Sequence, residues 1–378
     1  MALVTHPSTQ WAKDWRSPQR ILCVRLDALG DLLMTTPAIT AIKETHPTCE
    51  ITLLTSAAGA AIAALLPCID DVMVYDAPWL KATAPRTSSQ PDYDWIEKIR
   101  DRHFDAAIIF TVYSQSALPS AMMAYFADIP LRLAHCRENP YQLLTHYIQD
   151  PEPEQFIRHE VQRQLDLVKS IGCTTHDPRL RVTVSEAAKH SIKQHLHHWG
   201  LDSRQNWIVV HAGASAPSRR YPSEQFAKVT QTLSQQGITP VFTGVASEQT
   251  LVDSIRQQMS APSQTLVGQL TLSEMTALLA TAPLLLSNNT GPVHLAAAVG
   301  TPVVDLYALT NIQHTPWQVP SRVLYHDVDC RLCYKSICPE GHHDCLRLVS
   351  PEQVVAAVLD LLQSTSSVPL SGALLAGS

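Results

Sequence analysis

Residues 21–31 read ILCVRLDALGD and set the pattern for the N-terminal half of the chain. The apolar run 21–24 predicts a buried strand, and residues 32–45 predict the helix that follows it. Pro37 lies inside this predicted helix and is expected to bend or interrupt it, because proline has no backbone N–H to donate. A strand followed at once by a helix is the opening of a parallel α/β sheet.

The same alternation continues along the chain and then restarts. In the first half, strands are predicted at 51–55, 72–75 and 106–110, with helices at 57–66, 95–103, 117–126 and 154–171. In the second half, strands are predicted at 207–211, 239–243, 266–267, 284–287 and 303–306, with helices at 223–236, 247–259, 272–281 and 294–299. We therefore expect two successive parallel-sheet domains, with ligand sites at the carboxyl ends of their strands.

The domain limits follow from this pattern. The expected boundary lies in the polar stretch near residues 185–205. The predicted parts are an N-terminal domain at 20–190, a C-terminal domain at 200–348, a helix at 350–364 and a disordered tail at 365–378. A surface loop is expected at 76–91, which is rich in Pro, Ser and Thr.

Composition excludes several classes of protein. The 378 residues are 45% apolar and 16% charged with a net charge of −6, which is typical of a globular protein and not of a disordered chain or a basic nucleic-acid binder. The first 20 residues have no apolar core of a signal peptide, and nine cysteines without export indicate a reducing compartment. Three long uncharged runs, 51–69, 106–127 and 275–304, are interrupted by polar or turn-forming residues and are interpreted as buried strand and helix, not as membrane spans.

Two short segments have the composition of catalytic or anion-binding loops. Gly30 permits close approach of the backbone, and Asp31, at or near the start of the first helix, is either a helix cap or a carboxylate that acts as a general base. Residues 287–294, SNNTGPVH, lead from a buried strand into a helix whose free N–H groups suit a diphosphate, or else form only a capped helix with a buried His294.

Basic residues follow the first strand of the second half. Residues 211–215, HAGAS, are small and lie just before Arg219 and Arg220. Small residues expose backbone N–H groups to an anion, and paired arginines clamp phosphate; the alternative is a solvated arginine pair ahead of a helix.

Four cysteines are grouped near the C-terminus. They are Cys330, Cys333, Cys338 and Cys345. Four thiols within 16 residues could close a tetrahedral structural zinc site, but one Cys-x-x-Cys with two irregularly spaced partners fits unliganded thiols or disulfides as well.

The combined pattern resembles the ADP-heptose:lipopolysaccharide heptosyltransferases, glycosyltransferase family nine. Residues 21–38 resemble the family's N-terminal signature, and residues 288–298, NNTGPVHLAAA, resemble its donor-site signature. Residues 219–222, RRYP, resemble its basic-basic-aromatic-Pro step, and the cysteine group resembles one found in many members.

The resemblance implies a GT-B architecture, in which two Rossmann-like domains face each other across a cleft. It further implies an inverting, metal-independent transfer with Asp31 as general base. Gly30 and Arg25 are expected on the acceptor side of the cleft. No cofactor is expected to be required for catalysis.

The resemblance also assigns donor contacts. Arg219 matches a basic position that faces the donor phosphates, and Glu248 matches an acidic residue that contacts the nucleoside. The expected contacts to diphosphate and sugar are Asn289, Thr290, Gly291 and His294. Many heptosyltransferases carry Asp where this chain has Asn289, so the identity of the donor sugar stays open.

The expected partners are a nucleotide sugar, with ADP-heptose favoured, and a lipid-linked or glycan acceptor such as the lipopolysaccharide core. The expected location is the cytoplasm, with peripheral contact at the inner face of the inner membrane. The alternatives are a GT-B transferase or epimerase for another nucleotide sugar, a catalytically silent sugar-nucleotide-binding protein, and a zinc-dependent interaction module.

Overall fold

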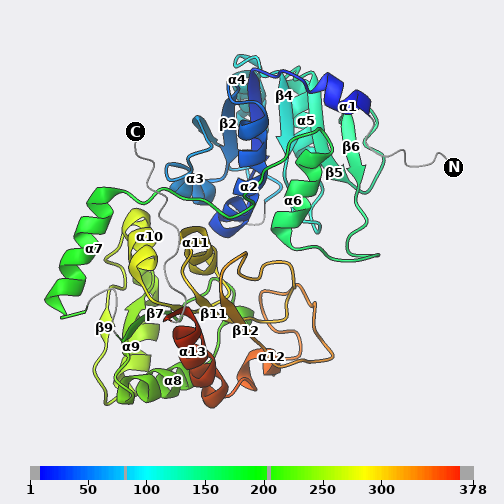
Figure 1. Cartoon of the computed structure of the whole chain (residues 1–378). Helices are drawn as coiled ribbons and strands as arrows, with labels where there is room; N and C mark the ends of the chain where they lie inside the picture. Colours follow the sequence, from blue (N-terminus) through cyan, green and yellow to red (C-terminus); the bar gives the residue numbers. More distant parts are fainter. Residues whose placement is uncertain (1–8, 81–82, 202–205, 367–378) are drawn as a thin grey trace. The chain divides into compact units, whose positions relative to one another are not determined.

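The computed structural model describes residues 9–80, 83–201 and 206–366. The chain divides into two compact units, Met1–Thr183 and Val184–Ser378. Each unit contains one six-stranded sheet with helices packed on it (Figure 1).

The sheet of the first unit is parallel throughout. Its strands are β1 (Arg20–Arg25), β2 (Glu50–Thr55), β3 (Asp71–Val74), β4 (Ala106–Ile109), β5 (Leu131–Cys136) and β6 (His146–Gln149). They lie in the order β3-β2-β1-β4-β5-β6, which is the Rossmann winding. The winding reverses between β1 and β4, so a ligand site is expected where these two strands end.

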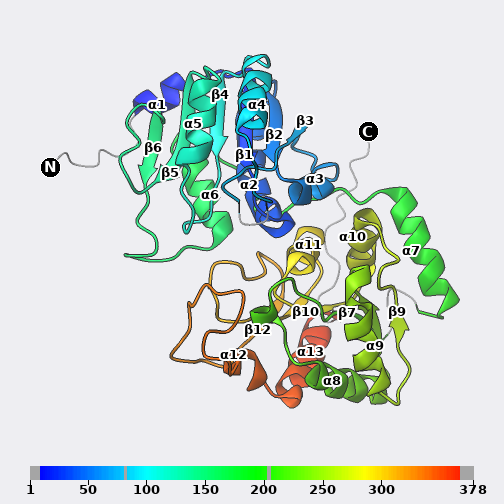
Figure 2. The ribbon, with the colours of Figure 1, turned by 180° about the vertical axis from the view of Figure 1, so that it is seen from behind.

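Helices cover both faces of this sheet. They are α1 (Thr9–Asp14), α2 (Leu29–Thr45), α3 (Ala57–Ala63), α4 (Gln90–Arg100), α5 (Leu118–Phe126) and α6 (Glu160–Lys169). Helices α2 and α6 pack side by side on one face, and α4 and α5 lie on the other (Figure 2). Leu22 and Val24 of β1 belong to the core under α4 and α5. Because side chains alternate along a strand, Arg25 points to the opposite face, toward α6.

Helix α2 continues through Pro37, so the expected interruption was wrong, and the alternative of a bend stays a prediction. A proline at position 37 leaves the carbonyl of Leu33 without its usual N–H donor. The Thr36 hydroxyl donates to that carbonyl at 2.7 Å and replaces the missing bond.

The sheet of the second unit repeats the same winding. Its strands are β7 (Trp207–His211), β8 (Thr239–Thr243), β9 (Gln264–Thr265), β10 (Leu285–Asn288), β11 (Val303–Leu306) and β12 (Ser321–Leu324), in the order β12-β11-β10-β7-β8-β9. The winding reverses between β7 and β10, which places the loops after these strands at the second expected ligand site.

The helices of the second unit form two groups. They are α7 (Glu186–His198), η1 (Pro217–Arg219), α8 (Ser223–Gln235), η2 (Ala246–Glu248), α9 (Gln249–Gln257), α10 (Leu272–Thr281), α11 (Gly291–Val299), α12 (Asp344–Arg347) and α13 (Pro351–Ser366). Helix α8 packs between α9 and α13, and α10 packs against α7 and α11. The first group covers a core that includes Ile208, Phe242 and Val358.

The predicted fold class, α/β with two Rossmann-like parallel sheets, is confirmed, but several elements were missed. Strand β5 carries Arg132, which reads as a surface residue. In the structure Arg132 is buried, and its guanidinium is satisfied by hydrogen bonds to the carbonyls of Gln142 and Leu143 at 2.8 Å. Helix α7 lies in the polar stretch near residues 185–205, where the boundary was expected. It buries Ala188, Ile192 and Leu196 and packs on α10, and the division between the units falls at 183/184. Of the tail predicted at 365–378, residues 367–378 lie outside the described residues.

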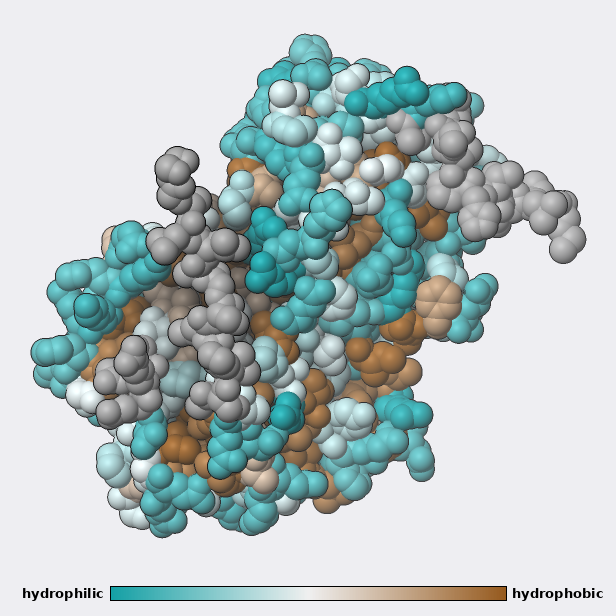
Figure 3. Space-filling view, in the orientation of Figure 1, coloured by the Kyte–Doolittle hydropathy of each residue, from teal (hydrophilic) through white to brown (hydrophobic). Residues whose placement is uncertain are grey.

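The three uncharged runs form strands and helices, as predicted. The runs correspond to β2 with α3, to β4 with α5, and to α10, β10 and α11. Among the described residues no helix has the length and apolarity needed to cross a bilayer. Hydrophilic side chains cover much of the face drawn in Figure 3, with apolar side chains between them.

Candidate functional site

Asp31 lies in the first turn of α2, just beyond the carboxyl end of β1. The N-cap of this helix is Ala28, which makes no side-chain cap, so the cap position itself is not held by Asp31. The Asp31 side chain is 19% exposed, and its Oδ1 lies 3.5 Å from Nη2 of Arg25. A partly open carboxylate therefore stands where the winding of the first sheet reverses.

Arg25 is fully buried behind Asp31. Its Nε lies 3.0 Å from Asp27 Oδ2, and its Nη1 donates to Glu160 Oε1 at 2.9 Å. Burial disfavours the guanidinium charge, but Asp27, Glu160 and Asp31 together raise the pKa of Arg25. The Arg25 side chain has no exposed surface and contacts these carboxylates, and its place on the acceptor side of a cleft stays a prediction.

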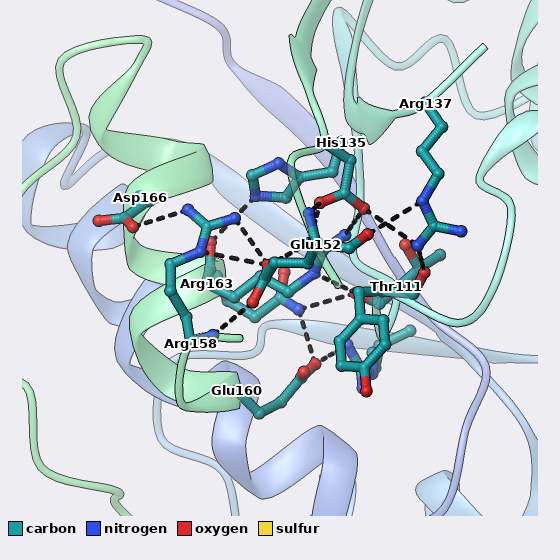
Figure 4. A network of polar contacts seen from close by, with 12 residues as sticks. Thr111, His135, Arg137, Glu152, Arg158, Glu160, Arg163 and Asp166 are labelled. Atoms are coloured by element: carbon teal, nitrogen blue, oxygen red, sulfur yellow. Dashed lines mark hydrogen bonds and ion pairs between the residues drawn. The ribbon is translucent and has the colours of Figure 1, made fainter. Parts of the chain in front are cut away.

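The contacts of Glu160 extend into a larger polar network, drawn in Figure 4. Glu160 accepts a hydrogen bond from Gln164 Nε2 at 2.7 Å. Gln164 Nε2 and Arg163 Nε both donate to the carbonyl of Thr111 at 3.0 Å. The start of α6 is thereby tied to the loop that follows β4.

The other half of the network is centred on Arg163. Its Nη1 lies 2.8 Å from Asp150 and 2.7 Å from Glu152, and both carboxylates are buried. Arg158 pairs with Glu152 as well. The buried ring of His135 contacts the Arg163 carbonyl at 3.1 Å, and burial together with the Arg163 charge lowers the pKa of His135. Removal of one partner from a buried ion pair of this kind would leave the other charge uncompensated and so destabilise the fold.

A pocket of about 320 Å³ opens at the same edge of the first sheet. It is lined by Val24, Leu26, Asp27, Trp79, Leu80, Phe110, Thr111, Ser114, Gln115, Ser116, Pro119 and Ser120. Trp79 is 37% exposed, and other lining residues carry hydroxyl and amide groups. Asp27 also lines the pocket and accepts a hydrogen bond from Gln115 at 2.6 Å, so one residue contacts both a pocket-lining side chain and Arg25.

In the second unit, Asn288 joins the two loops that meet at the reversal of the winding. Its Oδ1 accepts from the backbone N–H of Tyr221 at 2.9 Å, and its Nδ2 donates to the carbonyl of Ala212 at 2.7 Å. The side chain is fully buried. It therefore fixes the loop after β7 relative to the loop after β10.

Asn289 is hydrogen-bonded to Asp305 of β11. The Asn289 Nδ2 donates to Asp305 Oδ2 and to the carbonyl of His314, both at 2.9 Å. Burial raises the pKa of Asp305 to about 8, against the opposing effect of the Asn289 hydrogen bond. The Asn289 Nδ2 thus donates its hydrogen bonds to groups inside the protein.

Helix α11 begins at Gly291, two residues after Asn289. Thr290 is the N-cap and makes no side-chain cap, and Pro292 lies in the first turn. The positive end of the helix dipole is therefore available to an anion at Thr290 and Gly291. His294 is buried one turn into α11, with its ring 6.5 Å from that of His314.

Arg219 and Glu248 both lie at this edge of the second sheet. Arg219 ends η1, and its positive charge opposes the effect of burial, which raises the pKa of Tyr307. Tyr307 in turn accepts a hydrogen bond from the backbone N–H of His314, so Arg219 is close to the loop that supports Asn289. Glu248 accepts a hydrogen bond from the Val245 N–H at 2.9 Å. Its carboxylate packs directly on Gly213, because a Cβ added at Gly213 would lie 1.8 Å from Glu248 Oε1.

The four C-terminal cysteines line one small cavity of about 20 Å³. All four are unpaired thiols, and the Cys330 sulfur lies 3.7 Å from His342 Nε2. Within the described ranges no three His, Cys, Asp or Glu side chains are arranged to hold a metal ion. The four thiols therefore gather at one cavity, and a zinc ion bound there stays a prediction.

Comparison with known proteins identifies the family. The model of glycosyltransferase family 9 (heptosyltransferase) matches residues 93–343, more than half of the chain. This chain belongs to glycosyltransferase family 9. It is 30% identical over 164 residues to the lipooligosaccharide heptosyltransferase 2 of Campylobacter jejuni, an alignment that covers 42% of this chain and about half (51%) of that relative. It is 24% identical over 298 residues to the lipopolysaccharide core heptosyltransferase OpsX of Haemophilus influenzae, covering 78% and 80% of the two chains.

A solved structure of a heptosyltransferase has the same fold as this chain. The structure of the E. coli ADP-heptose lps heptosyltransferase II matches with a TM-score of 0.70 at 21% identity, over 92% of this chain and 100% of that one. At this identity the likeness establishes the fold, which is the predicted GT-B class.

Sequence reasoning missed the residues that support the site. Glu160, Gln164 and Asp305 were not singled out, although all three are fully buried. A signal was present in α6, where Glu160, Gln164 and Leu167 recur at the spacing of one helix face. Polar residues on a face that also carries buried leucine indicate partners elsewhere in the fold.

Proposed function

We propose that this chain transfers a heptose or a related sugar from a nucleotide sugar, with ADP-heptose favoured, to a lipopolysaccharide core or another glycan acceptor. The observation that carries the proposal is the repetition of the Rossmann winding. One reversal point carries a partly open carboxylate, and the other carries a helix N-terminus without a side-chain cap, with Arg219 in the segment that follows β7. A base and an anion-binding turn are the two groups that direct displacement of a nucleoside diphosphate requires.

In the proposed reaction Asp31 takes the proton of the acceptor hydroxyl. The acceptor oxygen forms a bond to the anomeric carbon as the bond from that carbon to the diphosphate oxygen breaks. Attack opposite the leaving group inverts the configuration in one step. The nucleoside diphosphate departs with the bonding electrons, and its charge is stabilised by Arg219 and by the backbone at Thr290 and Gly291.

The pocket of the first unit is proposed to hold the acceptor sugar. Its lining combines an exposed face of Trp79 with the hydroxyl and amide groups of Ser114 and Gln115. Sugar rings present an apolar face and a hydroxylated rim, and this lining matches both. For a lipid-linked acceptor the chain would act at the cytoplasmic face of the inner membrane.

The donor contacts are proposed from the second unit. Glu248 would contact the nucleoside, and His294 the diphosphate or sugar. Because the donor side of the Asn289 amide is bound to Asp305, only its carbonyl oxygen is left for a ligand. Asn289 would thus offer a ligand a neutral hydrogen-bond acceptor, where many heptosyltransferases carry a charged Asp. This difference supports a second candidate, a GT-B transferase or epimerase that uses another nucleotide sugar.

The proposed transfer requires no metal ion, because Arg219 and the helix N-terminus supply the positive charge that the leaving group needs. Any zinc in the cysteine cluster would be structural. No step of the reaction involves the cluster.

A donor screen tests the proposal. The full chain is incubated with ADP-heptose, UDP-sugars and GDP-sugars together with glycan acceptors, and release of nucleoside diphosphate is measured. Release from ADP-heptose that depends on the acceptor supports the main proposal, and release from another donor supports the second candidate. Donor binding without release, or epimerised donor without a new glycosidic bond, contradicts a transferase.

A further inference from the structure

We propose that Glu160 is a positioning residue for Asp31 and acts through the buried guanidinium of Arg25. The inference rests on the proposed function, since it takes Asp31 as the base. It adds a residue that lies in a different element, α6, and that has no exposed surface with which to contact a substrate.

One guanidinium contacts carboxylates from three parts of the first unit. Asp27 comes from the segment after β1, Asp31 from α2 and Glu160 from α6. Neither Nε nor Nη2 of Arg25 makes a hydrogen bond to a described residue. Their contacts with Asp27 and Asp31 are ion pairs. The one hydrogen bond that the structure describes for this guanidinium runs from Nη1 to Glu160. Glu160 therefore determines the direction in which Arg25 presents Nη2 to Asp31.

Glu160 is itself fixed in place. It is the first residue of α6, and its Oε1 also accepts from Gln164, which is anchored on the carbonyl of Thr111. The negative charge is further favoured by the positive end of the α6 dipole. The carboxylate is thus held rigidly enough to orient a second side chain.

Charge gives Glu160 a second effect on Asp31. A guanidinium close to a carboxylate favours the ionised form and so makes the carboxylate a weaker base. The charged groups that face Arg25 are Asp27, Asp31 and Glu160. Glu160 offsets part of the guanidinium charge, so Arg25 can hold Asp31 in place without removing its basicity.

The test is Glu160→Gln in the full chain, with kcat/KM for the transfer measured across pH. Glutamine keeps the shape and an acceptor oxygen but removes the charge. The expected loss in kcat/KM is roughly three- to tenfold. The acidic limb of the profile is expected to move to lower pH by about one unit, because the guanidinium charge is then less compensated. Donor affinity is expected to stay unchanged, because the proposed donor residues lie in the second unit.

Asp166→Asn is the matched control. It removes one carboxylate from the same helix, where Asp166 pairs with Arg158 and not with Arg25. Its acidic limb is expected at the wild-type position. Glu160→Asp keeps the charge on a shorter side chain, so its limb is expected near that position. If Glu160→Gln does not fold, Glu160→Asp tests the positioning alone: the shorter carboxylate loses its close contact with Arg25 Nη1, so kcat/KM is expected to fall, and an unchanged kcat/KM would contradict the inference.

Three outcomes would overturn the inference: unchanged activity in Glu160→Gln, lost activity with the acidic limb unmoved, or an equal shift of the limb in Asp166→Asn. The first two would leave Glu160 with a structural role at most. Failure of the proposed function is a separate result, since Asp31→Asn would then retain its turnover whatever Glu160→Gln does.

Discussion

Replacing Asp305 by asparagine is expected to stabilise the chain, and more strongly as the pH rises. Asp305 is fully buried, and its pKa rises from the ordinary 3.8 to about 8 in the folded protein. The folded state therefore binds a proton more tightly than the unfolded state. The protonated carboxyl is tolerated at low pH, and folding stability is lost progressively as the pH rises from about 4 to about 8.

The shift sets the size of the effect. At roughly 1.4 kcal/mol per pKa unit, ionisation of Asp305 costs on the order of 3 kcal/mol at pH 6 and up to about 6 kcal/mol above pH 8. Asparagine removes this cost while keeping an oxygen that can accept from Asn289. The new N–H donors of asparagine replace Oδ1, an atom without a hydrogen-bond partner among the described residues. A buried donor left without an acceptor costs roughly 1–3 kcal/mol at every pH. The change in the variant's advantage with pH is therefore the sharper quantity.

The assay is urea unfolding of wild type and Asp305→Asn at pH 6 and pH 8.5. The advantage of the variant is expected to grow by about 3 kcal/mol between these values. Asp360→Asn is the control, since Asp360 is a 60% exposed carboxylate in the same unit and pairs with Arg322 at the surface. A variant whose difference from wild type is the same at both pH values would refute the reasoning.

Three further predictions concern the proposed site. Arg219→Ala is expected to weaken nucleoside-diphosphate binding by roughly 10- to 100-fold, since hydrogen bonds to charged groups contribute about 1.5–3 kcal/mol; titration calorimetry measures this, and unchanged affinity would remove Arg219 from the phosphate site. Trp79→Ala is expected to raise the acceptor KM by roughly tenfold through loss of stacking, with donor affinity constant; a rise in donor Kd alone would place the acceptor elsewhere. Treatment with a chelator is expected to leave the transfer rate of the folded protein unchanged, and a loss restored by added zinc without any change in circular dichroism would argue against metal-independent transfer.

Much of the fold could be predicted because it depends on local patterns. A short apolar run followed by a helix, as at residues 21–45, specifies a strand and a crossover helix in a parallel sheet. Asp31 and Gly291 follow the ends of predicted strands, but the strand orders that place them at the two reversal points are seen only in the structure. Strand β5 and helix α7 could not be predicted in this way, because the partner of Arg132 lies outside its own strand and α7 is largely polar with few buried apolar residues.

The support of the site could not be predicted because it depends on contacts between distant residues. Arg25 and Glu160 are 135 positions apart, and no spacing rule links them. Asp305 lies within the apolar run of β11 and was read as part of a strand, while its hydrogen bond comes from Asn289, on the loop after the neighbouring strand β10. The sequence therefore indicates which loops carry chemistry, and the three-dimensional structure is needed to show what holds them.

Turnover and donor affinity measured on the same preparation of Asp31→Asn test the account most directly. The substitution keeps the size of the side chain and removes the proton acceptor. The account predicts that sugar transfer falls by roughly 10²- to 10⁴-fold, while the dissociation constant for the donor stays at the wild-type value. Transfer at the wild-type rate, or a parallel loss of transfer and donor binding, would contradict Asp31 as the base.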